Sequence, residues 1–447
     1  MSSRAFQDSG IEWIGRVPTD WRLMPLKYIA TFSGGGTPGR ERPDFWNGGI
    51  PWVSPKDMKT EVIVSAEESV TEAGVQHSST SIQPPDSLLL VVRSGILQHT
   101  IPVAINKVPV ALNQDMKALY FNKALCLPRF AFRWIQGFNE QLLLAWRKAG
   151  ATVESIEQQY LAQTIVPLPS LPEQAAIAAF LDRETAKIDE LVEEQKRLID
   201  LLKEKRQAVI SHAVTKGLNP HAPMKDTGIE WLGEVPEHWE LIPTKRLTSL
   251  ITSGPRGWSE QTGEHGSIFF QSQNIGRLME TSFAECTRVT VDMTADAERA
   301  QLMAGDVVVC ITGARTSAVA HVTELHETAF VNQHVCLVRP AHIQGRFLAY
   351  AIFSVSGQVQ LQLAMYGLKQ GLSLQDVRDI VVPVPPLSEA IAITGQLDQF
   401  TNRIDLAIRE AEQSITLLRE RRTALISAAV TGKIDLRDTA EVHEAAA

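Results

Sequence analysis

The clearest pattern of apolar and polar positions along the chain lies in residues 173–216. No Gly or Pro interrupts this stretch, which Pro172 precedes and Gly217 closes. Apolar residues recur in it on an alternating 4,3 stripe that also carries three polar residues: Ile177, Leu181, Glu184, Ile188, Leu191, Gln195, Leu198, Leu202, Lys205 and Val209. A stripe of this period predicts a coiled-coil helix. At a rise of about 1.5 Å per residue, such a helix is roughly 60 Å long and suited to act as a spacer.

The same pattern returns in residues 388–432, where an offset of 216 superposes the two stretches. Ile177 falls on Ile393, and the run that precedes each stretch is repeated as well, at 165–171 and 381–387. The second stripe continues through apolar residues at similar spacing: Ile404, Ile408, Ala411, Ile415, Leu418 and Leu425. We therefore expect two long helices that bury their stripes against each other.

A second repeat begins each half of the chain, at residues 8–29 and 226–247, with an offset of 218. Both copies contain the pattern GIEW-x-G-x-VP-x-x-W. The tryptophans stand at the same spacing in each copy, which predicts that they are fixed packing anchors rather than functional residues: Trp13, Trp21, Trp231 and Trp239.

Two regions of roughly 120 residues lie between the front repeats and the helices, and they resemble each other much less. Each contains a Gly/Pro loop, a strand-like run that ends in Gly, and an Asn-Gln pair. These features lie at 33–40, 88–95 and 113–114 in the first region and at 253–258, 305–313 and 332–333 in the second. Short strands, turns and short helices of this kind predict mixed α/β domains, and therefore an α+β fold class.

The expected organisation is a variable domain and a long helix, each present twice in an internal repeat. The boundaries expected from the patterns are 1–172 for the first domain, 173–216 for the first helix, 217–387 for the second domain, 388–432 for the second helix and 433–447 for a disordered tail. The scaffold parts repeat closely, whereas the domains between them have diverged.

The charge balance does not by itself favour a nucleic-acid partner, because the formal net charge is −8. The variable regions are close to neutral, with 12 Lys/Arg against 10 Asp/Glu in residues 30–150 and 8 against 10 in residues 248–370. The excess acid lies mainly in the connecting segments and in the tail. Charge alone therefore favours a protein-binding scaffold over a DNA-binding protein, although it excludes neither.

The N-terminus and the cysteines indicate a cytoplasmic chain with no membrane association. The first ten residues are polar and lack the apolar region of a signal peptide, and no apolar run approaches membrane-spanning length. The four cysteines show no CxxC-type spacing: Cys126, Cys286, Cys310 and Cys336. We expect reduced thiols and no cysteine metal site.

Taken together, the doubled motifs resemble one known family, the specificity subunits of type I restriction–modification enzymes (the HsdS family). The resemblance rests on the front repeat at 10–21 and 228–239, on a P-x-P-x-L run at 167–171 and 383–387, and on the two long helices that follow. It covers essentially the whole chain.

The resemblance implies a fold and a division of labour. Two target-recognition domains would each read one half of a bipartite site in double-stranded DNA. The two helices would form an antiparallel coiled coil that spaces these domains, with a pseudo-twofold relation between the halves. Two methyltransferase subunits and motor-endonuclease subunits would be the partners. Adenine methylation with S-adenosylmethionine, and restriction with ATP and Mg, would belong to those partners, so this chain would be a non-catalytic subunit without a cofactor.

The residues agree with that division of labour, because complete catalytic motifs are missing. Asn219-Pro-His lacks the second Pro of a methyltransferase Asn-Pro-Pro-aromatic motif, and no G-x-x-x-x-G-K-[ST] loop is present. One nuclease-like pattern exists, Asp44 followed by Asp57 and Lys59. Two acids and a lysine can hold a metal ion and a water for phosphodiester hydrolysis. A stand-alone metal-dependent nuclease is therefore one alternative function, and a coiled-coil scaffold without DNA specificity is another.

Reading DNA requires cationic side chains for phosphates and Arg, Lys, Asn or Gln side chains for base edges. Loops rich in Gly and Pro allow the backbone to approach a ligand closely. Candidates in or beside such loops of the first domain are Arg40, Arg42, Lys56, Arg93 and Gln114. Candidates in the second domain are Arg256, Gln271, Asn274, Arg277, Arg315 and Lys369.

The order of the repeats also predicts where the chain ends lie. The second helix ends at Gly432 with no domain after it, whereas the front repeat at Gly10 has no helix before it. If the helices are antiparallel, these two ends meet. The N- and C-terminal segments should then lie close together.

Overall fold

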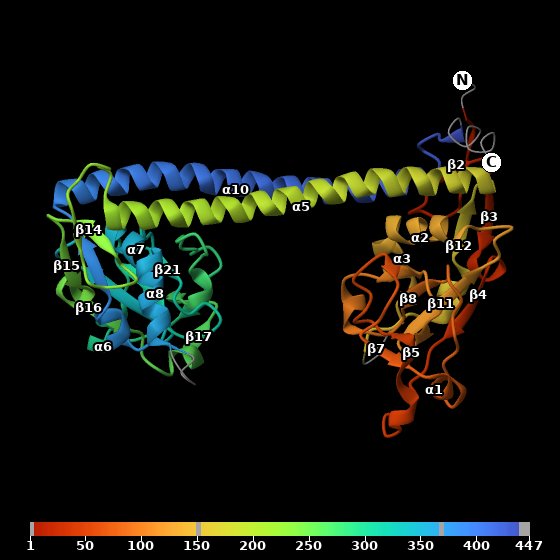
Figure 1. Cartoon of the computed structure of the whole chain (residues 1–447), viewed down its shortest axis with the longest axis horizontal. Coiled ribbons are helices and arrows are strands. Elements are labelled where there is room, and N and C mark those ends of the chain that lie inside the picture. Colours follow the sequence, from red (N-terminus) through yellow and green to blue (C-terminus); the bar gives the residue numbers. More distant parts are fainter. Residues whose placement is uncertain (1–3, 149–152, 366–370, 438–447) are drawn as a thin grey trace. The chain divides into compact units, whose positions relative to one another are not determined.

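The computed structural model describes residues 4–148, 153–365 and 371–437. The chain divides into two compact units: unit 1 comprises residues 1–194 and 414–447, and unit 2 comprises residues 195–413. Each long helix, α5 (Leu171–Lys216) or α10 (Leu387–Val430), contributes one part to each unit. Sheets and short helices complete both units (Figure 1), so the predicted α+β fold class is confirmed.

Unit 1 is built on a sheet with one completely buried strand, β8 (Leu88–Val91). The other strands of unit 1 are β1 (Phe6–Asp8), β2 (Arg16–Pro18), β3 (Arg22–Pro25), β4 (Ala30–Gly34), β5 (Trp46–Val53), β6 (Val62–Ile63), β7 (Glu68–Val70), β9 (Val103–Asn106), β10 (Ala111–Leu112), β11 (Met116–Phe121) and β12 (Ile165–Leu168). Its short helices are α1 (Glu72–Gln76), α2 (Pro128–Gly137), α3 (Asn139–Trp146) and α4 (Gln158–Gln163). The main sheet has the order β4-β11-β8-β9-β6, and a smaller one the order β10-β5-β7. All four residues of β8 are apolar, as expected of a strand covered on both faces.

Unit 2 repeats this plan around its own buried strand, β20 (Val307–Cys310). Its other strands are β13 (Met224–Asp226), β14 (Glu234–Pro236), β15 (Glu240–Pro243), β16 (Thr248–Ser253), β17 (Thr262–Gly263), β18 (Ser267–Phe270), β19 (Arg288–Val289), β21 (Val319–His321), β22 (Ala329–Val331), β23 (Val335–Pro340) and β24 (Val381–Val384). Its short helices are α6 (Ala295–Ala300), α7 (Gly345–Phe353), α8 (Val355–Ala364) and α9 (Leu374–Arg378). The two main sheets have the orders β16-β23-β20-β21 and β17-β19-β18-β22.

In each unit, α5 and α10 lie side by side and antiparallel (Figure 1). In unit 1, Ile177 near the start of α5 shares a core with Ile426 near the end of α10. In unit 2, Ile210 near the end of α5 shares a core with Ile393 near the start of α10. The predicted pairing of two long helices is therefore confirmed.

The buried stripe of α5 differs from the predicted 4,3 stripe. Leu191 and Leu198 were expected in the seam, but each is 43% exposed, whereas the neighbouring Val192 and Ile199 are buried. The most regular buried residues are isoleucines at intervals of eleven: Ile177, Ile188, Ile199 and Ile210 in α5, and Ile393, Ile404, Ile415 and Ile426 in α10. An eleven-residue repeat corresponds to about 3.67 residues per turn, close to the 3.6 of a straight helix. The heptad prediction was wrong in register because a strict 3.5 period drifts by about 20° per heptad along such a helix.

Three of the four repeated tryptophans, Trp13, Trp21 and Trp239, pack as predicted. Trp21 and Trp239 are buried, and their indole N–H groups donate to Glu173 at 3.1 Å and to Glu389 at 3.2 Å. Trp13 packs against Phe138 with ring centroids 4.9 Å apart. The front repeat of unit 1 is thereby fastened to the first turn of α5, and the front repeat of unit 2 to the first turn of α10.

The end of α10 meets the front repeat of unit 1, as the order of the repeats predicts. A Cβ on Gly432 would lie 2.5 Å from Pro18 Cγ and 3.1 Å from Trp21. Arg4 lies 3.9 Å from Asp435, so the N- and C-terminal segments are neighbours. Leu436 is buried in the core of unit 1, and the disordered tail predicted from residue 433 therefore does not begin there. Residues 438–447 lie outside the described part of the chain.

Candidate nucleic-acid interface

Unit 1 gathers its loops at one edge of the main sheet. The C-terminal end of β4 pairs with the start of β11 (Gly34 with Lys117), and the end of β8 pairs there too (Val91 with Met116). The parallel pair β5 and β10 ends at the same place, because Asn113 N–H donates to the Val53 carbonyl. Loops 35–45, 54–61, 92–102 and 113–115 therefore all leave this edge, which we call the loop edge.

Unit 2 has a corresponding loop edge. Ser253 at the end of β16 pairs with Cys336, and Cys310 at the end of β20 pairs with Val335. Asn332 N–H donates to the Phe270 carbonyl, in the same way as Asn113 in unit 1. The loops that leave this edge are 254–261, 271–287, 311–318 and 332–334. The first loop approaches the Asn-Gln segment so closely that only glycine fits: a Cβ on Gly254 would lie 1.9 Å from a backbone oxygen, as it would on Gly35 in unit 1.

Arg40 is held on an aromatic platform at the loop edge of unit 1. Its guanidinium lies 3.9 Å from the Trp46 ring centroid and 5.1 Å from that of Trp52. The indole N–H groups of these residues donate to carbonyls of the 35–45 loop. Arg40 also donates to Glu68, and this hydrogen bond lowers the pKa of the Glu68 carboxyl. Stacking and pairing fix the guanidinium in place while half of the side chain stays exposed.

Arg93 and Gln114 belong to a second group of contacts at the same edge. Arg93 Nε donates to Asp115 at 2.6 Å. Gln114 donates to the same carboxylate at 3.4 Å and accepts a hydrogen bond from Thr37, which lies on the loop that also carries Arg40. The structure thus brings Arg40, Arg93 and Gln114 to one edge.

The matching position in unit 2 carries different chemistry. Thr312 occupies the place of Arg93. Arg93 forms an isolated bridge with Ser155, in the segment before β12, and Thr312 forms one with Gly371, in the segment before β24. His334 occupies the place of Asp115, because both directly follow the Asn-Gln pair. The Thr312 hydroxyl and His334 Nδ1 are hydrogen-bonded, and Gln333 lies 3.1 Å from the other ring nitrogen. An ion pair at one loop edge thus corresponds to a hydroxyl–imidazole pair at the other.

The remaining candidates are placed differently. Arg42 is exposed beside Asp44, and Lys56 is exposed on the turn after β5. Asn274 is buried, and its side-chain oxygen accepts from the Gln271 backbone N–H at 2.9 Å, so it closes a turn. Further exposed or half-buried candidates lie at the loop edge of unit 2: Arg256, Gln271, Arg277 and Arg315. Lys369 lies outside the described residues.

The nuclease pattern does not assemble into a site. Asp57 accepts from the backbone N–H groups of Ser54 and Glu67 at 2.8 and 2.7 Å, which makes it a turn cap. Asp44 pairs with its neighbour Arg42, and Lys59 lies 3.5 Å from Glu67. Within the described residues, no group of three His, Cys, Asp or Glu side chains is arranged to hold a metal ion.

Sequence reasoning missed the residues that hold the candidates in place. Trp46 and Trp52 are the first and last residues of the WNGGIPW segment. This pair of aromatic residues, close to Arg40 in the sequence, was the available signal for a platform that holds the guanidinium. Asp115 and His334 directly follow the Asn-Gln pairs, but nothing local indicated their partners. The four cysteines have free thiols, as expected. No helix in the described ranges has the length and apolar character needed to cross a membrane.

The first comparisons concern the sequence. A family model described as "Type I restriction modification DNA specificity domain" matches residues 18–201. The Escherichia coli type I restriction enzyme EcoR124I/EcoR124II specificity subunit is 36% identical over 198 residues, which cover 44% of this chain and 46% of that protein. This alignment thus spans less than half of the relative. The Methanocaldococcus jannaschii type I restriction enzyme MjaVIII specificity subunit is 23% identical over 440 residues, 95% of each chain.

A solved structure extends the likeness to the fold. A chain from the study "Structural basis underlying complex assembly and conformational transition of the type I R-M system" matches with a TM-score of 0.71 and 16% identity. The match covers 94% of this chain and 99% of the other. At this level of identity the comparison establishes the shared fold.

Proposed function

We propose that the chain belongs to the family of type I restriction–modification specificity subunits and is the sequence-specific DNA-binding subunit of such an enzyme, as its similarity to members of that family supports. It binds a bipartite target in double-stranded DNA and directs methylation and restriction there. Residues 1–172 and 217–387 are the two target-recognition domains, and 173–216 and 388–432 are the spacer helices. The chain itself carries out no catalysis.

The observation that carries the proposal is the pair of loop edges with one frame and different side chains. Both edges have the same strand ends, the same close glycine and the same Asn-Gln turn. At matching positions one presents Arg93 with Asp115 and the other Thr312 with His334. A protein distinguishes base edges by such differences in hydrogen-bond donors and acceptors. Contacts between cationic side chains and phosphates carry no sequence information. Two differing edges therefore suit two different half-sites.

The partners follow from the proposed role. Two methyltransferase subunits supply adenine methylation with S-adenosylmethionine, and motor-endonuclease subunits supply ATP- and Mg-dependent cleavage. The complex works in the cytoplasm, where the DNA is. The candidate contacts with DNA are Arg40, Arg42, Lys56, Arg93, Gln114, Arg256, Gln271, Arg277, Arg315 and Lys369, whereas Asn274 supports the turn beneath them.

An exchange of one domain tests the proposal. Residues 248–370 are replaced by the matching region of a relative, and the methylated motif is read by methylome sequencing of cells that carry the complete system. One half of the motif should change while the half read by unit 1 stays the same. The reciprocal exchange of residues 30–150 is the matched control and should change the other half. A motif that is unaffected by both exchanges, in a complex that still methylates, would contradict DNA reading by this chain.

A further inference from the structure

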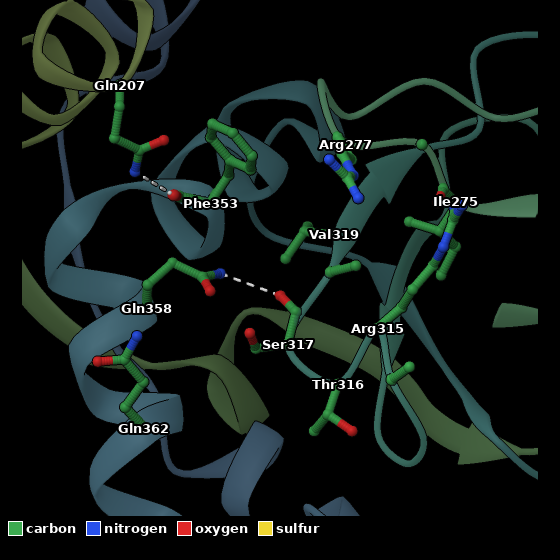
Figure 2. A pocket seen from close by; sticks show the side chains of 13 residues that line it. Gln207, Ile275, Arg277, Arg315, Thr316, Ser317, Val319, Phe353, Gln358 and Gln362 are labelled. Atoms are coloured by element: carbon green, nitrogen blue, oxygen red, sulfur yellow. Dashed lines mark hydrogen bonds between the residues drawn. The ribbon is translucent and has the colours of Figure 1, made fainter. Parts of the chain in front are cut away.

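Unit 2 contains a hollow of about 400 Å³ between the 311–318 loop and helix α8 (Figure 2). The polar side chains that line it are Gln207, Arg277, Arg315, Thr316, Ser317, Gln358 and Gln362. Among the described residues, no carboxylate lines the hollow. Glu280, on the adjoining turn, lies against Gly276 of the lining, and its carboxylate accepts from the Leu278 backbone N–H at 2.8 Å. The lining is therefore rich in hydrogen-bond donors and positively charged.

Several of these side chains have fixed positions. Arg315 donates to the carbonyls of Ile275 and, at 3.2 Å, of Gln273. Gln358 donates to the Ser317 carbonyl at 3.1 Å, which fastens α8 to the loop. Arg277 and Gln362 have no side-chain partner among the described residues, and Figure 2 shows them on opposite sides of the hollow. These two side chains are available to a ligand.

A buried arginine lies beside the hollow. Arg206 on α5 is 3% exposed and stacks on Phe353, which lines the hollow, at 5.3 Å from its ring. It donates to Asp405 at 2.8 Å and to the Leu278 carbonyl at 2.6 Å, but its Nη1 has no acceptor. A buried donor without an acceptor is costly, so this side of unit 2 lacks a hydrogen-bond acceptor.

In unit 1, the matching arginine has a carboxylate as a further partner, which Arg206 lacks. Arg422 is the repeat of Arg206, and it donates to Asp189 and also to Glu61, both at 2.9 Å. Glu61 also accepts from Arg133 at 2.9 Å. Although burial opposes it, hydrogen bonding and these arginines lower the pKa of the Glu61 carboxyl. Where unit 1 places a carboxylate, unit 2 offers only the backbone carbonyl of Leu278.

We propose that the hollow of unit 2 binds a phosphate group, which supplies the negative charge that Glu61 supplies in unit 1. Arg277 and Arg315 are the cationic donors, and Gln362 is a neutral donor. Guanidinium groups match the geometry of phosphate oxygens, and the volume falls in the range of ligand sites. The phosphate is a DNA phosphodiester or a free phosphate. The first source rests on the proposed function and is favoured because Arg315 lies on a loop of the loop edge.

Calorimetric titration of the full chain with inorganic phosphate tests the site itself. Binding should weaken about tenfold in Arg277→Gln, since one charged hydrogen bond is lost. Gln362→Glu should weaken it at least as much, because a carboxylate then faces the arginines, whereas the neutral Gln362→Met should weaken it less. Arg299→Gln is the matched control, an exposed arginine of the same unit paired with Asp296, and should bind as the wild type does. Circular dichroism verifies that each variant is folded.

A second titration, with duplex DNA that contains the methylated motif, distinguishes the two sources. If a phosphodiester occupies the hollow, phosphate competes with the duplex, and Arg277→Gln lowers the salt dependence of duplex affinity by about one unit. If only free phosphate binds there, duplex affinity is unaffected, and the site still stands. Phosphate binding without any duplex binding would refute the proposed function alone. Phosphate affinity that is absent, or equal in the wild type, Arg277→Gln and Gln362→Glu, together with unchanged duplex binding, would overturn the site.

Discussion

At the scale of single residues, the glycines that end the long helices are set by their backbone and by their neighbours. Gly217 and Gly432 have φ of +74° and +72°, the left-handed conformation that closes a helix without a Cβ penalty. Both also lie against the tryptophan of a front repeat. Sequence showed that each helix stops at glycine, but not that the same glycine is a contact point.

Gly432→Ala should lower the free energy of unfolding of unit 1 by about 2 to 4 kcal/mol, since left-handed strain and a clash with Pro18 add together. Gly10→Ala is the control: its φ is +73°, but nothing lies within 4 Å of the new Cβ. It should cost only about 1 to 2 kcal/mol. Urea unfolding followed by tryptophan fluorescence measures both. Equal losses would show that the space around Gly432 does not matter.

At the scale of elements, the long helices show how period and register differ as signals. Their bounds, Leu171–Lys216 and Leu387–Val430, lie within two residues of those expected from the sequence. A proline, a glycine and an uninterrupted polar–apolar pattern are local signals, and they were sufficient to predict where each helix begins and ends. The buried face was less certain because neighbouring residues point about 100° apart, so a small error in period moves the seam by one residue.

Truncation of two neighbouring residues distinguishes the seams. Ile199→Ala should destabilise unit 2 by about 2 to 4 kcal/mol because a buried side chain is lost. Leu198→Ala should cost less than about 1 kcal/mol, since Leu198 is 43% exposed. Thermal unfolding of the two variants provides the comparison. A larger loss for Leu198→Ala would restore the heptad seam.

At the scale of the whole molecule, both long helices run without a break from one unit into the other. If they set the separation of the two half-sites, their length should appear in the DNA target. Paired insertions of four residues, after Lys196 in α5 and after Ser414 in α10, add about one turn, or roughly 6 Å, to each helix. Since DNA rises about 3.4 Å per base pair, we expect a spacer longer by one or two base pairs and unchanged half-sites.

The methylated motif of cells that carry the insertions is the measurement. Paired insertions of two residues are the control, because they rotate the isoleucine stripe by about 200° and should abolish assembly. An unchanged spacer in a folded, active four-residue variant would show that the helices do not set the distance.

The sequence by itself determined the doubled plan of this protein, its α+β units, its two long helices and its resemblance to a known family. These depend on signals that are local or that repeat along the chain: period, glycine and proline at element ends, and identical residues at fixed offsets. The order of the repeats even predicted that the end of α10 meets the front repeat of unit 1, which the contact of Gly432 with Pro18 confirms.

Only the tertiary structure decided which side chains act together. Arg93 pairs with Asp115, and Thr312 with His334, across 22 residues in each case. The hollow of unit 2 joins Gln207, Arg277, Arg315 and Gln362 from distant parts of the chain. Such groupings depend on how strands pair and how loops leave a sheet edge, and no local pattern encodes them. Asn274 illustrates the difference: its residue type suggested a base contact, but its burial makes it the cap of a turn.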